Sequence, residues 1–524
     1  MDAAGPPPTD AVPPTTPASE DRADRLTILS GTGQNVAGLV VALLATFGSQ
    51  VLITRSLGAA AYGVVYVGTQ VAFVGAAATR FGMDVAAVRR VAIDVGKGEP
   101  GRARAVVSRA ATIAAVASVV AAVALYLAAP ALAGSGGIPA NAVGVFRAAA
   151  LALPFVALAQ VYLGGTRGLK IMSHTLSIYW AGQPLAWIAL MAAGFAFRPT
   201  ETTGVLAYAG SWILATLAAL WAWRHETRAF GHLPPAAGET ADLLRYGTPR
   251  APASLFAQLL FVADLFVLAR YAPASEYGVY AAAVRVGQVV VLFLISVNLV
   301  FSPFVADLHA RGRHDRLNDL FKAVTRWTFA ATLPVILTLS VLAEPVLRLF
   351  GGEFATAGAR TALTVLIAGQ AVNVAVGSVG FILIMVGRTG WDLVVYTASI
   401  ALDLALAFWL APRYGMEGAA VAQAVTLVAS NALRLYLVWR FLRIQPFSRD
   451  YARLALPAIA GALAMIAVHL PLADGPWPVD LLVSAFAGTL AYTAALIVFG
   501  LAPEERAAAG RLLRNLRAGG LRTR

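Results

Sequence analysis

Long runs of apolar residues, separated by short polar segments, dominate the pattern of this chain. From Gly31 to Gly500 the runs recur at about 20 residues, the length that an α-helix needs to cross the hydrocarbon core of a bilayer. The pattern therefore predicts an all-α fold, a polytopic membrane protein of 14 transmembrane helices. The predicted spans are residues 31–54, 62–80, 106–128, 143–164, 175–197, 204–223, 248–270, 277–301, 323–343, 359–385, 393–411, 416–440, 453–471 and 479–500.

Two pairs of these spans repeat each other in sequence. An offset of about 215 positions superimposes Arg55 on Arg270, Tyr62 on Tyr277, Gly63 on Gly278, Val64 on Val279 and Val71 on Val286. Six spans separate the copies, so both halves enter the membrane from the same side and are related by an axis along the membrane normal. We therefore expect two pseudo-symmetric six-helix lobes, with a substrate path between them, and two extra C-terminal helices.

The polar segments set the limits of these parts. The first residues are rich in Pro, Ala and Thr and carry too few apolar side chains to pack, so we expect a disordered tail. Lys and Arg gather in both tails and in alternate loops, and this asymmetry places both termini in the cytoplasm. The expected parts are the cytoplasmic tail 1–27, the first transmembrane lobe 28–232, the second lobe 240–443, helices 13 and 14 at 450–500, and the basic cytoplasmic tail 501–524.

The composition supports a membrane protein and removes several classes of function. Apolar residues make up 59% of the chain, charged residues make up 13%, and the mean hydropathy is +0.72, all far from the range of soluble proteins. The absence of cysteine excludes disulfides, thiolate metal sites and cysteine nucleophiles. The net charge of +13 comes from basic residues beside the membrane helices, which anchor to anionic lipids. We therefore expect no nucleic-acid partner, no metal and no cofactor.

Arg285, Asp264 and Asp403 are isolated ionisable residues well inside predicted spans, where a charge that faces lipid is costly. Arg285 and Asp264 are on adjacent spans, at similar depths of roughly 9–12 Å if each residue rises about 1.5 Å. Arg285 is the best candidate for binding a substrate phosphate, because its planar guanidinium can donate two hydrogen bonds. Asp264 either pairs with Arg285 structurally or forms a charge switch with it that substrate or a cation breaks. Asp403 either binds a coupling proton or sodium ion or pairs with Arg434.

The other polar candidates have two interpretations each. Arg55 and Arg270, equivalent in the repeat, form a release gate for an anionic head group or simply reach the membrane interface. Arg434 is a further candidate for substrate binding. The amides inside the spans line a sugar-binding cavity or hydrogen-bond between helices. These amides are Gln50, Gln70, Gln160, Gln183, Gln258, Gln288, Gln370, Asn373 and Gln423.

Four short motifs resemble those of a known family. LGAAAYGVVYVGTQV (Leu57 to Val71) and its copy APASEYGVYAAAVRV (Ala272 to Val286) resemble signature turns of oligosaccharide flippases. These flippases are the polysaccharide biosynthesis transporters of the multidrug/oligosaccharidyl-lipid/polysaccharide exporter superfamily. EPVLRLFGGEF (Glu344 to Phe354) resembles the outer turn between the ninth and tenth helices of the family, and RYGMEGAAVAQAV (Arg413 to Val425) resembles the start of its twelfth helix. The resemblance covers roughly residues 28–500.

The resemblance implies a flippase that translocates polyprenyl-(pyro)phosphate-linked oligosaccharide across the inner, cytoplasmic membrane by alternating access, for surface polysaccharide biosynthesis. The implied partners are the lipid-linked glycan, anionic membrane lipids, and a glycosyltransferase or polymerase of the same pathway. Two alternatives from the superfamily stay open: an ion-coupled multidrug exporter, which usually stops at twelve helices, and a peptidoglycan-precursor flippase, which has fourteen. We do not expect an enzyme, because the histidines and acids do not assemble a general base or metal pair beside an accessible loop.

Overall fold

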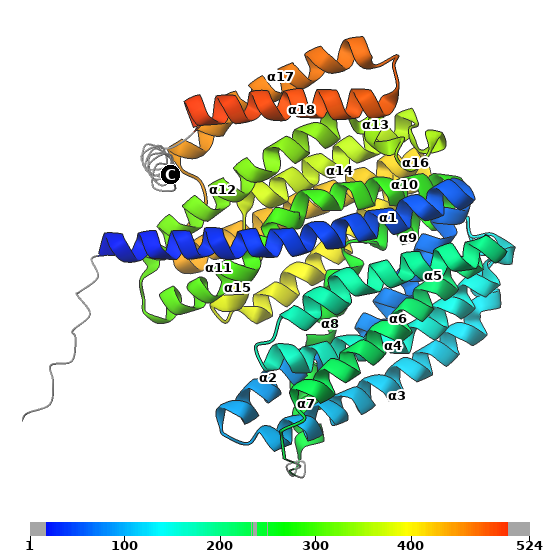
Figure 1. Cartoon of the computed structure of the whole chain (residues 1–524), viewed down its shortest axis with the longest axis vertical. Coiled ribbons are helices and arrows are strands. Elements are labelled where there is room, and N and C mark those ends of the chain that lie inside the picture. Colours follow the sequence, from blue (N-terminus) through cyan, green and yellow to red (C-terminus); the bar gives the residue numbers. More distant parts are fainter. Residues whose placement is uncertain (1–16, 232, 234–237, 249, 501–524) are drawn as a thin grey trace, which may run out of the picture.

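The computed structural model describes residues 17–231, 233, 238–248 and 250–500, and within these ranges the chain is helical with no β-strand (Figure 1). The predicted tail 1–27 lies mostly outside the described residues, although α1 begins at Pro17, and the predicted basic tail 501–524 lies wholly outside them. The first half contains α1 (Pro17–Thr79), α2 (Met83–Gly96), α3 (Pro100–Leu132), η1 (Ala140–Ala142), α4 (Val143–Gly168), η2 (Thr175–Gly182), α5 (Gln183–Phe197), α6 (Glu201–Glu226) and α7 (Glu239–Gly247).

The second half begins with a helix that lies next to α7 in the chain and ends with the helical hairpin at one edge of the molecule. It contains α8 (Arg250–Leu259), α9 (Ala263–Tyr271), α10 (Ala274–Gly287), η3 (Gln288–Val291), α11 (Leu292–Ala310), α12 (His314–Val341), α13 (Ala343–Leu347), η4 (Gly352–Phe354), α14 (Ala357–Val376), α15 (Val379–Met385), α16 (Thr389–Leu442), η5 (Arg449–Leu454), α17 (Ala455–Leu472), α18 (Trp477–Ala495) and η6 (Leu496–Gly500).

The described residues contain eleven helices long and apolar enough to cross a membrane, or twelve if α8 and α9, which meet at a bend of 53°, form one span. The structure is therefore an all-α polytopic membrane protein, as predicted, while the count of 14 stays a prediction. The difference arises because α1 and α16 each cover two predicted spans. Each of these long helices contains a glycine with non-helical backbone angles at the predicted boundary.

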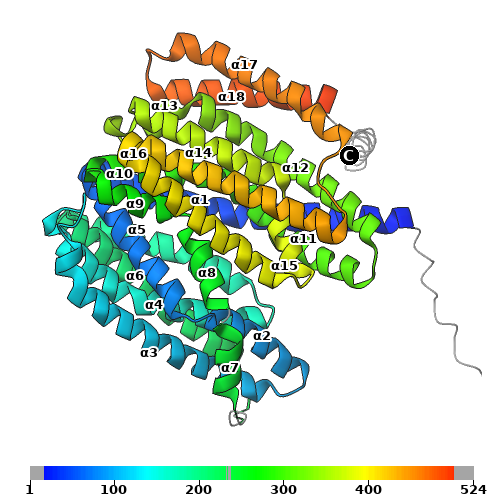
Figure 2. The same cartoon turned by 180° about the vertical axis from the view of Figure 1, so that it is seen from behind.

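These two glycines, Gly58 and Gly415, adopt positive φ values of 80° and 55°. A residue with a Cβ atom would be strained in this conformation. After each glycine the helix restarts with a carboxylate from another element at its first free N–H. Glu353 accepts a hydrogen bond from the Ala59 amide, and Glu276 accepts one from the Met416 amide, each over 2.8 Å. Both long helices consequently turn back on themselves, as the paths of α1 and α16 in Figures 1 and 2 show.

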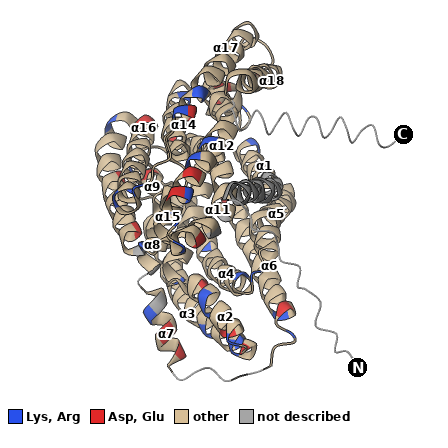
Figure 3. Cartoon of the chain, turned by 90° about the vertical axis from the view of Figure 1, so that its left-hand side faces the viewer, with Lys and Arg blue, Asp and Glu red and all other residues tan. Residues whose placement is uncertain are grey.

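The helices pack into two groups, which we call the amino-terminal bundle (α1–α6) and the carboxyl-terminal bundle (α8–α16). Figure 1 shows α2 to α6 side by side in one group, α10 to α16 in the other, and the hairpin of α17 and α18 on the far side of the second group. The domain bounds given above stay predictions. Figure 3 shows charged residues on α2 and α7 as well as on several helices of the carboxyl-terminal bundle.

The two bundles touch closely where the repeated motifs meet. A Cβ atom on Gly278 would lie 1.9 Å from the Ala59 carbonyl oxygen, and one on Gly63 would lie 2.6 Å from the Ala274 oxygen. Glycine is required at these positions because the two backbones approach more closely than any side chain allows. We call this contact the seam: residues 55–63 against residues 272–280 and 348–354. The two copies of the repeat therefore pack against each other.

Candidate functional site

A cavity of about 480 Å³ lies between the two bundles, within the size range of small-molecule sites. Its described lining comes from α1, η2, α5 and α6 on one side and from α8, α10, η3 and α11 on the other. The lining residues are Leu43, Thr46, Phe47, Ser49, Gln50, Thr69, Gln70, Phe73, Tyr179, Trp180, Gln183, Pro184, Trp187, Tyr208, Trp212, Gln258, Phe261, Val262, Arg285, Gln288, Val289, Val291, Leu292 and Ile295.

Arg285, on the last turn of α10, is the one charged side chain among these described lining residues. Its Nη1 atom donates a hydrogen bond to Oε1 of Gln288 over 3.1 Å, and its Cζ atom lies 5.2 Å from the centre of the Tyr66 ring. Its Nε atom is buried and has no hydrogen-bond partner within the described ranges. The prediction that Arg285 faces an internal cavity is therefore confirmed by the geometry, and the guanidinium keeps a free donor for an anion.

Amide side chains surround this cation on both bundles. Five of the nine predicted amides line the cavity, and one of them, Gln183 on α5, donates to the Ser211 hydroxyl on α6 over 2.9 Å. The five are Gln50, Gln70, Gln183, Gln258 and Gln288, whereas Gln160, Gln370, Asn373 and Gln423 do not line it. An amide offers both donors and an acceptor, so these groups suit a ligand with many hydroxyls.

Aromatic residues form one wall of the cavity, and sequence reasoning missed them. Trp180, Tyr179, Trp212, Tyr208 and Trp187 follow one another in edge-to-face contacts, with ring centres 5.2, 5.7, 6.1 and 5.0 Å apart. We call this set the aromatic ladder. A sequence signal for it exists: Tyr208 and Trp212 on α6 are four positions apart, and Trp180 and Trp187 are seven apart. Both spacings place side chains on one face of an α-helix.

Asp264, near the start of α9, does not pair with Arg285 in the described ion pairs, so the structural pair, one of the two alternatives above, is not formed in this structure. Asp264 is fully buried and accepts a hydrogen bond from the Tyr280 hydroxyl. The reason lies in the helical phase of α10. Tyr280 and Arg285 are five residues apart, which rotates one about 140° from the other around the helix axis. One side chain faces the interior of the carboxyl-terminal bundle and the other faces the cavity.

Asp403, on the first half of α16, lies close enough to Asp264 for the two carboxylates to interact. It is fully buried, and neither of its carboxylate oxygens has a hydrogen-bond partner in the described structure. The Thr426 hydroxyl, which is also buried without a partner, is a near neighbour. The structure therefore brings together Asp264, Asp403 and Thr426 inside the carboxyl-terminal bundle, apart from the cavity.

Arg434 is not the partner of Asp403. Its Nη2 atom lies 3.7 Å from the Asp392 carboxylate, its Nη1 atom donates to the Ser430 hydroxyl over 2.7 Å, and its Cζ atom lies 4.7 Å from the Tyr396 ring centre. The described lining of the cavity does not include Arg434. These contacts within one bundle favour a structural position for this arginine.

Arg55 and Arg270, although equivalent in the repeat, have different surroundings. Arg55 donates to the backbone oxygens of Arg348 and Leu349 over 2.8 and 3.1 Å and so joins the two bundles at the seam. Arg270 is exposed, and its Cζ atom lies 5.8 Å from the ring of its neighbour Tyr271. A symmetric arrangement is therefore absent from the structure, and neither arginine lines the described cavity.

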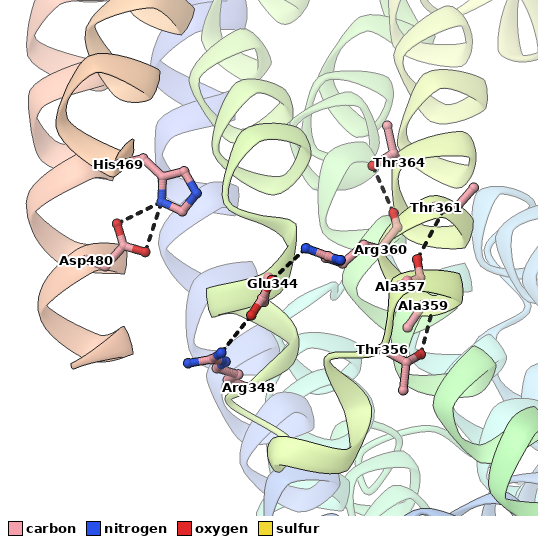
Figure 4. A network of polar contacts seen from close by, with 10 residues as sticks. All are labelled: Glu344, Arg348, Thr356, Ala357, Ala359, Arg360, Thr361, Thr364, His469 and Asp480. Carbon is pink, nitrogen blue, oxygen red and sulfur yellow. Dashed lines mark hydrogen bonds and ion pairs between the residues drawn. The ribbon is translucent and has the colours of Figure 1, made fainter. Parts of the chain in front are cut away.

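The turn that receives Arg55 is held by a small ionic network (Figure 4). Glu344 on α13 accepts from Arg348 over 2.6 Å and from Arg360 on α14 over 2.7 Å. On the neighbouring hairpin, His469 of α17 contacts Asp480 of α18 at 2.9 Å (Figure 4). The first network fixes the backbone carbonyls that close the seam.

A helical membrane protein whose two bundles flank a cavity lined by apolar, aromatic, amide and arginine side chains has the architecture of a transporter. The profile of the polysaccharide biosynthesis protein family matches residues 28–309, and the chain belongs to this family. A second profile, MatE, matches residues 249–409. No curated protein matches the chain significantly.

Solved structures share the fold at low sequence identity. The chain is similar to the lipid II flippase MurJ in its inward closed conformation, with a TM-score of 0.61, 14% identity, and coverage of 91% of this chain and 98% of that one. The chain is also similar to the D35N mutant of the Vibrio cholerae MATE transporter VcmN, with a TM-score of 0.59, 14% identity, and coverage of 81% of this chain and 98% of that one. A MOP superfamily transporter from Pyrococcus furiosus, described as having a binding pocket of reverse polarity, matches with a TM-score of 0.57 and 14% identity. The match covers 80% of this chain and 96% of that one.

Proposed function

We propose that the chain is a flippase for polyprenyl-(pyro)phosphate-linked oligosaccharide and works by alternating access. The observation that carries the proposal is the cavity between the bundles, in which Arg285 is the one charged side chain of the described lining. A phosphate group fits this site, because a guanidinium with an unpartnered buried donor gains charge-assisted hydrogen bonds from it. The surrounding amides suit sugar hydroxyls, and the lipid chain stays outside in the bilayer.

The seam supports a conformation in which one end of the path is closed. Arg55, the paired glycines and Glu353 hold the two bundles together at the end where the repeat motifs meet. The basic residues of α2 and α7 lie in segments that the sequence pattern assigns to the cytoplasm. The closed end then faces outward, and transport requires the seam to part. Reporter fusions at both termini test this orientation: active cytoplasmic reporters are expected.

The wall chemistry argues against a multidrug exporter for cationic compounds. Arg285 repels a lipophilic cation, and the described lining contains no acidic residue to offset this repulsion. The peptidoglycan precursor is a second candidate substrate, favoured by the shared fold with a lipid II flippase and by the additional hairpin of α17 and α18. Complementation separates the two: rescue of a strain that lacks its peptidoglycan-precursor flippase would favour this second candidate.

The buried acids suggest how transport is driven. Asp264 and Asp403 are fully buried in the carboxyl-terminal bundle without a described ion-pair partner, and buried carboxylates of this kind favour protonation or a bound cation. We propose that this group couples transport to an ion gradient. Flipping in proteoliposomes should fall when both the proton and the sodium gradient are collapsed. An unchanged rate would leave the flippase proposal intact and remove the coupling.

The decisive experiment for the function replaces Arg285. Arg285→Gln keeps the hydrogen bond with Gln288 feasible but removes the charge, so reconstituted vesicles should flip lipid-diphosphate-linked glycan at least tenfold more slowly. Arg285→Lys should retain part of the rate, because it keeps the charge and loses the planar fork. Arg440→Gln, on the exposed end of α16, is the matched control. Normal flipping by a folded Arg285→Gln variant would refute the proposed site.

A further inference from the structure

The aromatic ladder runs unbroken across three elements of the amino-terminal bundle. One end of the ladder is on η2, a stretch of π-helix in which no residue is buried, so Tyr179 and Trp180 remain open toward the cavity. π-Helical turns are rare and occur most often at functional sites. The other end, on α5 and α6, is packed into the bundle, with Trp212 only 3% exposed and Trp187 only 6% exposed. The end at Trp212 and Trp187 is therefore fixed in the bundle, and the end at Tyr179 and Trp180 presents its rings to the cavity.

The wall is not purely apolar. The indole Nε1 of Trp212 is buried and has no hydrogen-bond partner in the described part of the chain, although it belongs to a residue that lines the cavity. By contrast, Nε1 of Trp187 donates to the Gly204 oxygen over 3.0 Å. A buried N–H without a partner is costly unless a ligand or water satisfies it. The Tyr208 hydroxyl of the same ladder is the polar neighbour of Trp212, so the wall carries polar groups among its rings.

Arg285 lies near enough to interact electrostatically with Tyr179 and Tyr208, although it comes from the opposite bundle. A ligand that places a phosphate on Arg285 thus has its next few atoms beside the ladder. Aromatic faces carry a negative quadrupole and attract the polarised C–H groups of a pyranose ring, whose hydroxyls point sideways toward donors and amides. The order across the cavity is phosphate at one bundle and sugar at the other.

We infer that the aromatic ladder is a sugar-stacking subsite and that it selects a glycan whose phosphate-proximal residues are neutral sugars. The inference rests on the proposed function and specifies its substrate class. The charge distribution of the cavity disfavours acidic sugars. A carboxylate beside the ladder would lose its hydration, and no second cation would pair with it, because Arg285 already binds the phosphate. A cavity of about 480 Å³ admits the head group and only the first sugars, so selection acts at the phosphate-proximal end.

The test compares three soluble C20 lipid probes by native mass spectrometry of the purified full chain. The probes are a bare lipid diphosphate, the same lipid carrying a neutral N-acetylhexosamine–hexose disaccharide, and the same lipid carrying a disaccharide with a hexuronic acid. The neutral disaccharide lipid should bind at least tenfold more tightly than the bare diphosphate and about tenfold more tightly than the acidic one. Equal or tighter binding of the acidic probe would overturn the neutral-sugar assignment.

Variants then assign the gain to the ladder. Trp180→Leu should lose about tenfold affinity for the neutral probe and leave the bare diphosphate unchanged within twofold, while Trp180→Phe should recover most of the loss. Trp221→Leu is the matched control, because Trp221 is 63% exposed on α6 and stacks on His225 outside the cavity. If Trp180→Leu binds every probe as the wild type does, the ladder is only packing and the inference fails.

The phosphate site at Arg285 and the sugar subsite on the ladder can be refuted separately. Arg285→Gln should weaken binding of all three probes, since each carries diphosphate. If Arg285→Gln binds the bare diphosphate normally, the proposed phosphate site itself is wrong. If binding depends on Arg285 but a sugar adds no affinity, the flippase proposal stands and the sugar-stacking subsite falls. Thermal melting of each variant verifies that a loss of affinity comes from a folded protein.

Discussion

Buried tyrosines of α10 show how one hydroxyl differs from another in the same helix. Tyr277 and Tyr280 are both fully buried, but only the Tyr280 hydroxyl has a partner, the Asp264 carboxylate, while the Tyr277 hydroxyl has none in the described structure. Removing the donor to a buried carboxylate leaves an uncompensated charge, whereas removing an unpartnered hydroxyl relieves a cost.

Tyr280→Phe should therefore lower the free energy of unfolding by about 1–3 kcal/mol, and Tyr277→Phe should leave it unchanged or raise it slightly. The measurement is the melting temperature of the detergent-purified variants. The pair is matched in helix, burial and chemistry, so a similar loss in both variants would contradict the role assigned to the Tyr280 contact.

Glu239, outside the candidate spans at the start of α7, gives a prediction about pH. Burial raises the pKa of its carboxyl group, with Arg90 opposing this shift and Asp94 adding to it. Because the folded pKa is raised, the protonated form favours folding. The stability from this group is fully present below the ordinary pKa and is lost as pH rises through the raised one.

Glu239→Gln should raise the melting temperature at pH 7 relative to the wild type by roughly 1–2 °C and leave it unchanged at pH 4. The difference between the two proteins should grow steadily over that range. Leu244→Gln, at an exposed position on the same helix, changes no titratable group and is the control. A constant difference between pH 4 and pH 7 would refute the titration of Glu239.

At the scale of single residues, the sequence predicted positions better than partners. Arg285 was expected inside the molecule because lipid excludes a charge, and it lines the cavity. Its pair with Asp264, one of the two alternatives, is not formed, because similar depth does not fix the rotation of two side chains around their helices. The aromatic ladder was missed because aromatic residues at helical spacing are also the ordinary pattern of packed helices.

Among the elements, the hairpin of α17 and α18 is tied to the carboxyl-terminal bundle by one arginine. Arg326 of α12 is buried and donates from Nε to the Asp450 oxygen over 3.2 Å and from Nη2 to the Gly500 oxygen. It therefore holds the chain just before α17 and just after α18. Tyr492 adds a bond to the Ala330 oxygen over 2.7 Å.

Arg326→Leu should free both ends of the hairpin, since each unpaired buried carbonyl costs about 1–3 kcal/mol. Hydrogen exchange should become faster in residues 449–454 and 490–500 and stay unchanged in α3 and α4. Arg440→Leu, at an exposed position, is the control and should change neither region. Unaltered exchange near residues 449–454 in Arg326→Leu would refute the clamp.

Element boundaries followed from sequence only where local chemistry determines them. Hydrophobic runs located the helices, since burial in lipid requires apolar length. Gly58 and Gly415 fall at boundaries that the sequence predicted, between spans 31–54 and 62–80 and between spans 393–411 and 416–440. The carboxylates that cap the restarted helices, Glu353 and Glu276, were not predicted, because they come from distant elements. The π-helix η2 was not predicted either, as its backbone register depends on packing between elements.

For the molecule as a whole, the seam predicts how the two bundles respond to added volume. A methyl group on Gly278 would lie 1.9 Å from the Ala59 oxygen, whereas one on Gly287 would meet the Leu366 Cβ at an ordinary 3.6 Å. Gly278→Ala should therefore push the bundles apart at the seam, and Gly287→Ala should not.

Spin labels measure this directly, because the chain has no native cysteine. With labels on Ser135→Cys and Gly352→Cys, exposed positions on opposite bundles, Gly278→Ala should shift the distance distribution to longer values and Gly287→Ala should reproduce the parent. An unshifted distribution in Gly278→Ala would contradict the seam as a close contact.

The overall arrangement was predicted from the internal repeat. The offset that superimposed Gly63 on Gly278 identified residues that now lie against each other across the two bundles. The sequence did not reveal that the contact is asymmetric, with Arg55 bonded across it and Arg270 exposed. That difference comes from the surroundings of each arginine: the turn at Arg348 and Leu349 lies against Arg55, whereas Arg270 lies beside its own neighbour Tyr271.

Because the tightest part of the seam is main chain against main chain, it has no rotamers to rearrange when it separates. Neither partner can swing aside while the other stays in place, so no single residue can act as a latch that opens alone. Separation must therefore proceed as a concerted displacement of whole helices. Its rate should respond to bilayer thickness and lateral pressure more strongly than to any one side-chain substitution outside the glycine pair.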